Sequence, residues 1–238
     1  STTASVLAPI LTKLNCRVVA LNESVDETKM SISTEEFHQS IEQLGKICGA
    51  LETGLGVRLD VGGERIFVVD SAGLEVPGAK LAAGLARLAL IAEGGGVIAV
   101  PVTMPTVFEQ LAASLGGKVV RTKANLQAVM AAANGANVIM ATDGNGSFIW
   151  PRFQPVVDGM MTIAKLLEYL TEQHISIDEA LQAVPAYHTA EGHVACPWES
   201  KGTVMRLLNQ QYRDRLGDQI DGVKIMSALS STSVRGVG

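Results

Sequence analysis

Two acidic residues four positions apart lie in a glycine-rich stretch between two apolar runs. Residues 59–70 read LDVGGERIFVVD, with Asp60 and Glu64 on either side of Gly62 and Gly63. Carboxylates at this spacing in a glycine loop can converge on Mg²⁺, a hard cation that takes near-octahedral oxygen ligands at about 2.1 Å. Asp60 and Glu64 are therefore candidate metal ligands. A solvated turn between two strands, with ordinary surface charges, fits the same residues, and the loop by itself leaves both interpretations open.

Two other segments could suggest a metal site or a phosphate-binding loop, but their spacing argues against both. His188 and His193, with Glu191 between them, have the wrong spacing for one helix face, so a surface loop is expected there. Residues 94–96 are three glycines that precede a strand, whereas phosphate-binding loops follow a strand and open a helix. These glycines are predicted to end a helix.

Composition narrows the class of protein. Apolar residues make up 47% of the 238 residues and aromatic residues only 4%, as expected where helices pack closely on a sheet buried on both faces. A net charge of −5 without a Lys/Arg cluster argues against a nucleic-acid partner. Cys16, Cys48 and Cys196 lack metal-ligand spacing and suggest free thiols in a reducing compartment. We recognise no signal peptide and no apolar run of the roughly 18 residues that span a bilayer, so a cytoplasmic location without membrane contact is expected.

The elements that would position the acidic loop alternate between helix and strand patterns, which predicts a layered α/β architecture. Ser33 and Asp158 are typical helix caps. The helix that Asp158 begins is expected to bury Met160, Ile163, Ala164, Leu167 and Leu170. Helices are predicted at residues 4–14, 33–48, 77–93, 106–115, 125–134, 158–170 and 203–215, and strands at 16–21, 54–60, 66–70, 97–102, 118–122 and 138–141.

The acidic loop resembles the magnesium loop of the alpha-D-phosphohexomutases, the phosphomannomutase and phosphoglucomutase family. That loop reads Asp-Gly-Asp-Gly-Asp-Arg, and its three aspartates bind one Mg²⁺. Asp60 and Arg65 match it, whereas Gly62 replaces the second acid and Glu64 the third. The resemblance implies a Mg²⁺ site on Asp60 and Glu64 that has lost one ligand, and therefore weak or absent Mg²⁺ binding.

Further segments follow the family's order over roughly residues 1–225. Residues 142–147 (TDGNGS) stand where the family has its sugar-selecting loop, Gly-Glu-x-Ser-Gly-His. The resemblance implies that Arg65, Asp143 and Asn145 bind the substrate, the last two through sugar hydroxyls. The other matching segments are 100–103 (VPVT), 115–123 (LGGKVVRTK) and 157–161 (VDGMM), the last being the family's Asp-Gly helix start and the most specific match.

The departures from the family pattern are systematic. The sugar loop has Asp143 for glutamate, Asn145 for serine and Ser147 for histidine, and a serine cannot handle protons near neutral pH as histidine does. The family's Thr-x-x-Gly-His turn is present as residues 122–126 (TKANL), without its glycine. Altered polar positions in an intact apolar frame indicate a fold whose mutase chemistry was lost.

Two functional loops of the family are not found in the sequence. No segment resembles the phosphoserine loop of the Thr-Ala-Ser-His-Asn-Pro type, so no catalytic residue is predicted. Residues 185–225 resemble the start of the family's fourth domain, including CPWESKG at 196–202 and DGVKI at 221–225. The Arg-x-Ser-Gly-Thr phosphate loop should follow, but residues 226–238 match it too loosely and are expected to be a tail.

The sequence therefore predicts an α/β fold of two consecutive three-layer α/β/α domains with mixed sheets, followed by an incomplete α+β segment. Residues 1–74 would form a phosphohexomutase-like domain II, residues 75–185 domain III, and residues 186–238 part of domain IV and a tail. The expected function is a phosphohexomutase-like module, inactive by itself, within a larger sugar-phosphate or nucleotide-sugar protein, such as a fusion with a mannose-1-phosphate guanylyltransferase.

Two other functions stay open. The chain could be part of an active Mg²⁺-dependent phosphohexomutase, which transfers phosphoryl groups between a phosphoserine and the 1- and 6-positions of a hexose. It could also be a non-catalytic sugar-phosphate sensor that binds through Asp143 and Asn145. The expected partners are a hexose phosphate and neighbouring domains of a longer chain. A charged fraction of only 18% and a positive mean hydropathy also favour a homo-oligomer, with contacts at residues 1–14 or 185–225.

Overall fold

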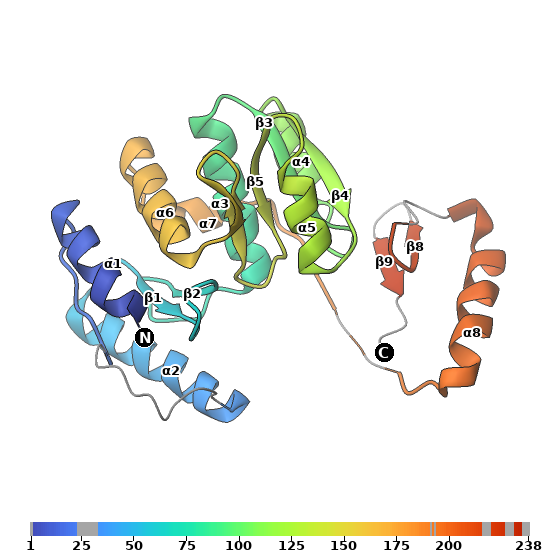
Figure 1. The fold of residues 1–238 in the computed structure, drawn as a ribbon, viewed down its shortest axis with the longest axis horizontal. Helices are drawn as coiled ribbons and strands as arrows, with labels where there is room; N and C mark the ends of the chain where they lie inside the picture. The colour runs from blue at the N-terminus through green and yellow to red at the C-terminus, as the bar shows by residue number, and fades with distance from the viewer. Residues whose placement is uncertain are drawn as a thin grey trace.

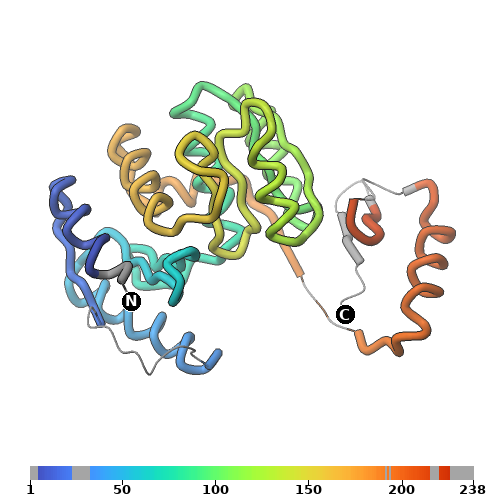
Figure 2. The backbone as a smooth tube through the Cα atoms, viewed as in Figure 1, coloured from blue at the N-terminus to red at the C-terminus, as the bar shows by residue number. Residues whose placement is uncertain are grey.

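The computed structural model describes residues 2–22, 33–190, 192, 194–215, 220–226 and 231–234 (Figures 1 and 2). Helices and strands alternate through most of this length, as the sequence predicts, and the strands form three sheets. None of the helices in these residues is long and apolar enough to cross a bilayer.

The first part of the chain consists of two helices and a hairpin, drawn in blue to cyan in Figure 1. α2 begins at the predicted cap, where Ser33 and Glu36 each accept a hydrogen bond from the other's backbone N–H. β1 and β2 pair in antiparallel register along their whole length. The bounds are Thr2–Lys13 for α1, Thr34–Leu51 for α2, Gly56–Leu59 for β1 and Ile66–Val69 for β2.

The strand predicted at residues 16–21 is wrong. Asn15 leaves α1 in a left-handed conformation (φ 64°), and the described residues after it join no ladder. A run of β-branched residues predicts a strand only if a partner offers a paired, half-buried surface. Val18 and Val19 are instead 38% and 61% exposed. The described sheet of this part is therefore the β1–β2 pair alone.

The second part is a three-layer α/β/α unit with a mixed sheet, which confirms the predicted fold class. The sheet order is β4-β3-β5-β6-β7, with β4, β3 and β5 parallel and β6 and β7 antiparallel. The bounds are Gly78–Ala92 (α3), Gly96–Pro101 (β3), Val107–Ser114 (α4), Gly117–Thr122 (β4), Leu126–Ala133 (α5), Val138–Thr142 (β5), Phe148–Trp150 (β6), Gln154–Val157 (β7), Gly159–Gln173 (α6) and Ile177–Gln182 (α7).

Alternation along the central strands divides the core into two layers. In β3, Ile98 and Val100 face the larger cluster, which contains side chains of α3, α4, α6 and α7. Ala99 faces the smaller cluster with Val129 of α5. The side-chain period of two along a strand is what allows helices to cover both faces. α3 is buried along most of its length, which explains its alanine- and leucine-rich sequence.

The predicted face of α6 is only partly correct. Ile163 and Leu170 are buried as expected. The centre of the buried face, however, is formed by Leu166 and Tyr169, while the predicted Leu167 is only partly buried. An apolar stripe of methionine and leucine continues around this helix, so periodicity alone places its face only to within about one residue.

The last described elements are a helix and a second hairpin. α8 buries none of its residues, and its first residue, Trp198, is 72% exposed. One hydrogen bond links this part to the three-layer unit, since the backbone N–H of Ala124 donates to Asp221 Oδ2 (2.9 Å). The bounds are Trp198–Gln211 for α8, Arg213–Arg215 for a short 3₁₀ turn, Val223–Met226 for β8 and Ser231–Val234 for β9.

Candidate functional site

The loop at residues 60–65 is held in shape by its first acid. Asp60 Oδ1 accepts hydrogen bonds from the backbone N–H groups of Glu64 (2.8 Å) and Arg65 (3.2 Å). Gly63 has φ 74°, a left-handed conformation that suits glycine, and its N–H donates to the Asp60 carbonyl (3.2 Å). One carboxylate oxygen of Asp60 is therefore committed to the turn, whereas the Glu64 side chain is exposed.

The loop at residues 142–147 is built in the same way. Asp143 Oδ1 accepts from the N–H groups of Asn145 (2.7 Å) and Ser147 (3.1 Å). Gly144, at φ 75°, packs against Met104 so closely that a Cβ would collide with its sulfur. Asn145 is exposed at the tip of this loop. Asp143 thus shapes its own loop with one oxygen, and its other oxygen faces Arg65.

Arg65 and Ser147 join the two loops. They form an isolated antiparallel bridge, and the N–H of Ile66 donates to the Gly146 carbonyl (3.0 Å). Arg65 Nε donates to Ser147 Oγ (3.2 Å), and Arg65 Nη2 lies 3.7 Å from Asp143 Oδ2. The structure therefore brings together the predicted metal loop and the predicted sugar loop, which are far apart in sequence.

A third segment, Asp158-Gly159, completes this edge. The N–H of Gly159 donates to the Gly63 carbonyl (3.0 Å), and a Cβ at Gly159 would lie 2.6 Å from that oxygen. Asp158 caps α6 as predicted, because its Oδ1 accepts from the Met161 N–H (2.8 Å). The sequence identified the cap but not the second role of the glycine, which is to let α6 begin directly against the 60–65 loop.

The three segments lie at a favoured place for ligands in an open α/β sheet. β4 lies on one side of β3 and β5 on the other, so the chain order reverses between β3 and β5. Ligands generally bind beyond the carboxyl ends of the strands at such a reversal. The loops that leave β3 and β5 meet there, through Met104 and Gly144. The position of Asp143, Asn145 and Arg65 is thus consistent with a binding site.

The side chains present make an incomplete donor set for Mg²⁺. Among the described residues, no group of three His, Cys, Asp or Glu side chains is placed to hold a metal ion. A Cβ built on Gly62 would lie 3.5 Å from Glu64 Cγ and 3.9 Å from Asp60 Oδ1. A carboxylate at position 62 would therefore reach toward the two acids, and with glycine there the loop offers the carboxylates of Asp60 and Glu64.

Sequence reasoning missed Arg121, which holds the loop that follows β3. Its side chain is only 6% exposed and pairs with Glu109 (2.7 Å). Its Nη1 donates to the carbonyls of Pro101 (2.8 Å) and Met104 (2.9 Å), and its Nη2 to Pro105 (3.0 Å). Arg121 thereby fixes the loop that presses Met104 onto Gly144. The available signal was an arginine at the end of a predicted strand.

Comparison with known proteins supports the predicted family resemblance. Residues 77–187 match the family model described as phosphoglucomutase/phosphomannomutase, alpha/beta/alpha domain III. A probable phosphoglucosamine mutase of Methanopyrus kandleri is 28% identical over 224 residues, which cover 93% of this chain and 50% of that protein. A phosphoglucomutase/phosphomannomutase of Thermococcus kodakarensis is 26% identical over 220 residues, covering 91% of this chain and 48% of that protein.

Solved structures agree on the fold. A phosphoglucomutase/phosphomannomutase family protein of Burkholderia thailandensis matches 95% of this chain and 49% of its own length, with a TM-score of 0.79 and 19% identity. This chain thus spans about half the length of the relatives that it matches. The predicted resemblance to the alpha-D-phosphohexomutase family is confirmed.

Proposed function

We propose that this chain is a phosphohexomutase-like module that binds a hexose phosphate at the edge formed by the 60–65 and 142–147 loops and does not itself transfer the phosphoryl group. The observation that most directly supports this is the contact of Arg65 with Ser147. Ser147 stands where the family has a histidine, is 1% exposed, and accepts a hydrogen bond from Arg65. Its hydroxyl has a structural role and no basic group that could move a proton.

Binding without turnover fits the remaining side chains of this edge. Asn145 is exposed and can meet a sugar hydroxyl, and Asp143 Oδ2, which lies 3.7 Å from Arg65 Nη2, is not used by the hydrogen bonds of its own loop. The side chain of Arg65 is 42% exposed, and guanidinium groups bind phosphates with strong, charge-assisted hydrogen bonds. The names of the matched proteins refer to phosphoglucosamine, phosphoglucose and phosphomannose, which makes hexose 1- and 6-phosphates the ligands to test.

Mg²⁺ would be held, if bound, by Asp60 and Glu64 with water completing the coordination shell. In this family the ion supplies charge neutralisation for the phosphate. Since the set of ligands is short of one carboxylate, we propose that binding is weak and that it contributes little to recognition. Arg65 then carries most of the positive charge toward the substrate.

We further propose that the module works within a larger cytoplasmic protein of sugar-phosphate or nucleotide-sugar metabolism. Phosphoryl transfer requires the donor, the metal and a clamp on the distal phosphate to be held together. Other domains of a longer chain would have to supply the first and the third of these. If they do, the same edge would belong to an active mutase.

A pair of measurements tests this function. In a coupled assay with a bisphosphate activator, the chain should not interconvert glucose or mannose 1- and 6-phosphates. In a titration followed by amide NMR, the same sugar phosphates should cause saturable shifts in residues 142–147. Asn145→Ala should weaken binding roughly tenfold, equivalent to about 1.4 kcal/mol.

Asn209→Ala is the matched control, because Asn209 is an exposed asparagine on α8. Robust turnover by the pure chain would contradict the loss of catalysis. Absence of saturable shifts, or equal weakening by the two asparagine variants, would contradict sugar-phosphate binding.

A further inference from the structure

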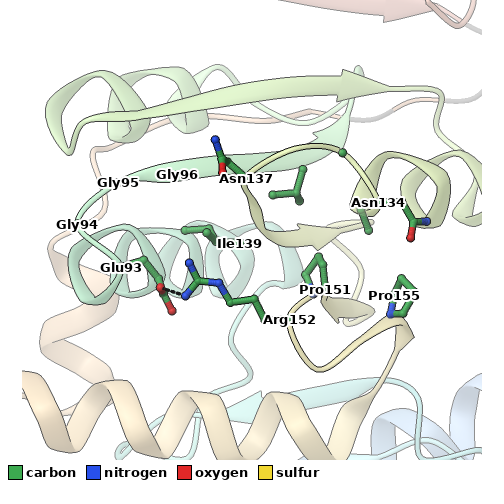
Figure 3. A pocket seen from close by; sticks show the side chains of 13 residues that line it. Glu93, Gly94, Gly95, Gly96, Asn134, Asn137, Ile139, Pro151, Arg152 and Pro155 are labelled. Carbon is green, nitrogen blue, oxygen red and sulfur yellow. Dashed lines mark hydrogen bonds and ion pairs between the residues drawn. The ribbon is translucent and has the colours of Figure 1, made fainter.

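A second concave surface lies at the opposite end of the sheet from the three loops. A cavity of about 780 Å³ opens at the amino ends of β3 and β5, where Gly96 and Val138 begin these strands (Figure 3). A smaller cavity of about 210 Å³ adjoins it and shares Glu93, Ile139 and Arg152 with it. The phosphohexomutase resemblance and the proposed function assign no role to this surface.

The helix ends that line the larger cavity make it attractive to a cation. α3 ends at Ala92 and α5 at Ala133, and both ends lie at its wall. The carboxyl end of a helix carries the negative end of the helix dipole, which favours a positive charge nearby. Neither helix has a basic residue in its last turn that would neutralise this negative potential.

Two polar side chains add to the negative character of the wall. Glu93 is the C-cap of α3, and its side chain is 22% exposed, so the carboxylate is partly sheltered from water. Asn134 is the C-cap of α5 and donates its side-chain amide to the Met130 carbonyl (3.1 Å), which leaves the side-chain oxygen to accept. Figure 3 shows both residues at the rim of the same hollow.

A cation from the protein itself already occupies part of this surface. The guanidinium of Arg152, which follows β6, extends to Glu93 and pairs with its carboxylate (Figure 3). The Arg152 side chain is 71% exposed, and an ion pair at this exposure contributes little to stability. Arg152 therefore indicates that the cavity accepts a cation. A ligand could displace Arg152 from Glu93 at little cost in folding stability.

The smaller cavity has aromatic residues in its lining beside the same carboxylate, and of these Phe153 is exposed. Trp150, Phe153 and Tyr169 line it. Lys165 Nζ lies 5.0 Å from the centroid of the Tyr169 ring, so that ring already faces one cation. An anion would bind less readily in either cavity, because Arg152 and Lys165 are paired with Glu93 and Glu168.

We propose that this surface is a binding site for a small organic cation, a guanidinium or primary ammonium compound. Glu93 is its charged partner, the carbonyl ends of α3 and α5 supply the surrounding negative potential, and Arg152 is the internal group that it displaces. The site lies beyond the amino ends of the strands, apart from the edge at which we place the hexose phosphate.

Removing the Arg152 side chain provides the test. Ethylguanidinium chloride is titrated into the full chain and followed by amide NMR, with sodium chloride of equal ionic strength as the blank. Arg152→Ala should bind the probe at least fivefold more tightly than the unaltered chain, with saturable shifts in residues 93–96 and 134–139. Adding Glu93→Gln to Arg152→Ala should abolish the saturable response.

Arg206→Ala removes an exposed arginine from α8 and is the control, with no change expected. The circular dichroism spectrum of each variant verifies that it is folded, and Glu93→Asp replaces Glu93→Gln should the latter unfold. The proposal is overturned if Arg152→Ala shows no saturable response, if the double variant binds equally well, or if inorganic phosphate produces the larger shifts at the same residues.

Discussion

Gly62 is the residue at which a single change should restore a metal ligand. Its φ is not positive, and a Cβ there meets only ordinary contacts with Glu64 and Asp60. Gly62→Asp should therefore keep the loop and bring a third carboxylate to the other two. We expect millimolar or weaker Mg²⁺ binding by the unaltered chain, and binding at least roughly tenfold tighter, about 1.4 kcal/mol, in the variant.

Isothermal titration calorimetry with MgCl₂ measures both affinities. Gly54→Asp adds the same charge at an open position outside the loop and controls for net charge. Micromolar affinity in the unaltered chain would refute the idea of a degenerate site. Equal gains in the two variants would show that charge, and not the loop, is responsible.

Tyr169 should make the protein sensitive to alkali. It is 3% exposed, and this burial, with smaller contributions from Glu93 and Glu168, raises the pKa of its phenol. A folded pKa above the unfolded value means that the contribution to stability is complete below about pH 10 and is lost as the pH rises further. Tyr169→Phe should flatten this alkaline decline.

Urea unfolding at several values between neutral pH and about pH 11 measures the slope. Tyr187 also has a pKa raised by burial, so part of the decline should remain in the variant. Tyr212→Phe, near the end of α8, is the control. An unchanged slope in Tyr169→Phe would contradict the prediction.

Some contacts at the residue scale follow from local sequence and others do not. The caps at Ser33 and Asp158 depend on neighbouring residues, and the sequence predicted both. The contact of Arg65 with Ser147 spans 82 residues, and no local pattern indicates it. The sequence named Arg65, Asp143 and Asn145 through the family resemblance, but it could not show that two of them touch.

At the scale of the elements, glycines distinguish the helix surfaces that contact backbone from those that face solvent. Gly159 and Gly45 leave no room for a Cβ, which would lie within about 2.6 Å of a carbonyl oxygen at Gly159 and closer at Gly45. Gly49, on the same helix as Gly45, has nothing within 4 Å. The same glycine-to-alanine substitution should therefore change the free energy of unfolding in opposite directions at Gly159 and at Gly49.

Gly159→Ala should lower the free energy of unfolding by about 1–3 kcal/mol, because α6 must move away from the 60–65 loop. Gly49→Ala should raise it by about 0.4–1 kcal/mol, because alanine restricts the unfolded chain. Denaturant unfolding of the two variants gives both values. Destabilisation by Gly49→Ala, or a neutral Gly159→Ala, would contradict the packing described here.

Element prediction succeeded for the longer apolar elements. In the three-layer unit from α3 to α7, the sequence predicted every element except the short β6, β7 and α7. The predicted strand at residues 16–21 failed because strand formation depends on a neighbouring strand, which composition does not reveal.

For the whole molecule, the exposed apolar stripe of α1 supports the predicted self-association. Val6, Ile10 and Leu14 are 44%, 43% and 60% exposed, at successive intervals of four residues. Such a stripe on a helix surface favours association. We expect a dimer or larger assembly by light scattering at tens of micromolar. Ile10→Glu should weaken it, whereas Thr12→Glu, on another side of α1, should not. A clean monomer would contradict the expectation.

The hydrogen bond between Arg65 and Ser147 also bears on which sequence changes this chain can accept. The larger core cluster joins Leu11, Ile66 and Val68 of the first part with α3 and α6 of the second, so the two parts share one interior. A substitution that removes Arg65 would also remove the hydrogen bond that Ser147 accepts, so a change in the 60–65 loop is felt in the 142–147 loop. Both loops of this chain depart from the family pattern. A substitution that restores the family pattern in one loop would have to be accommodated by the other.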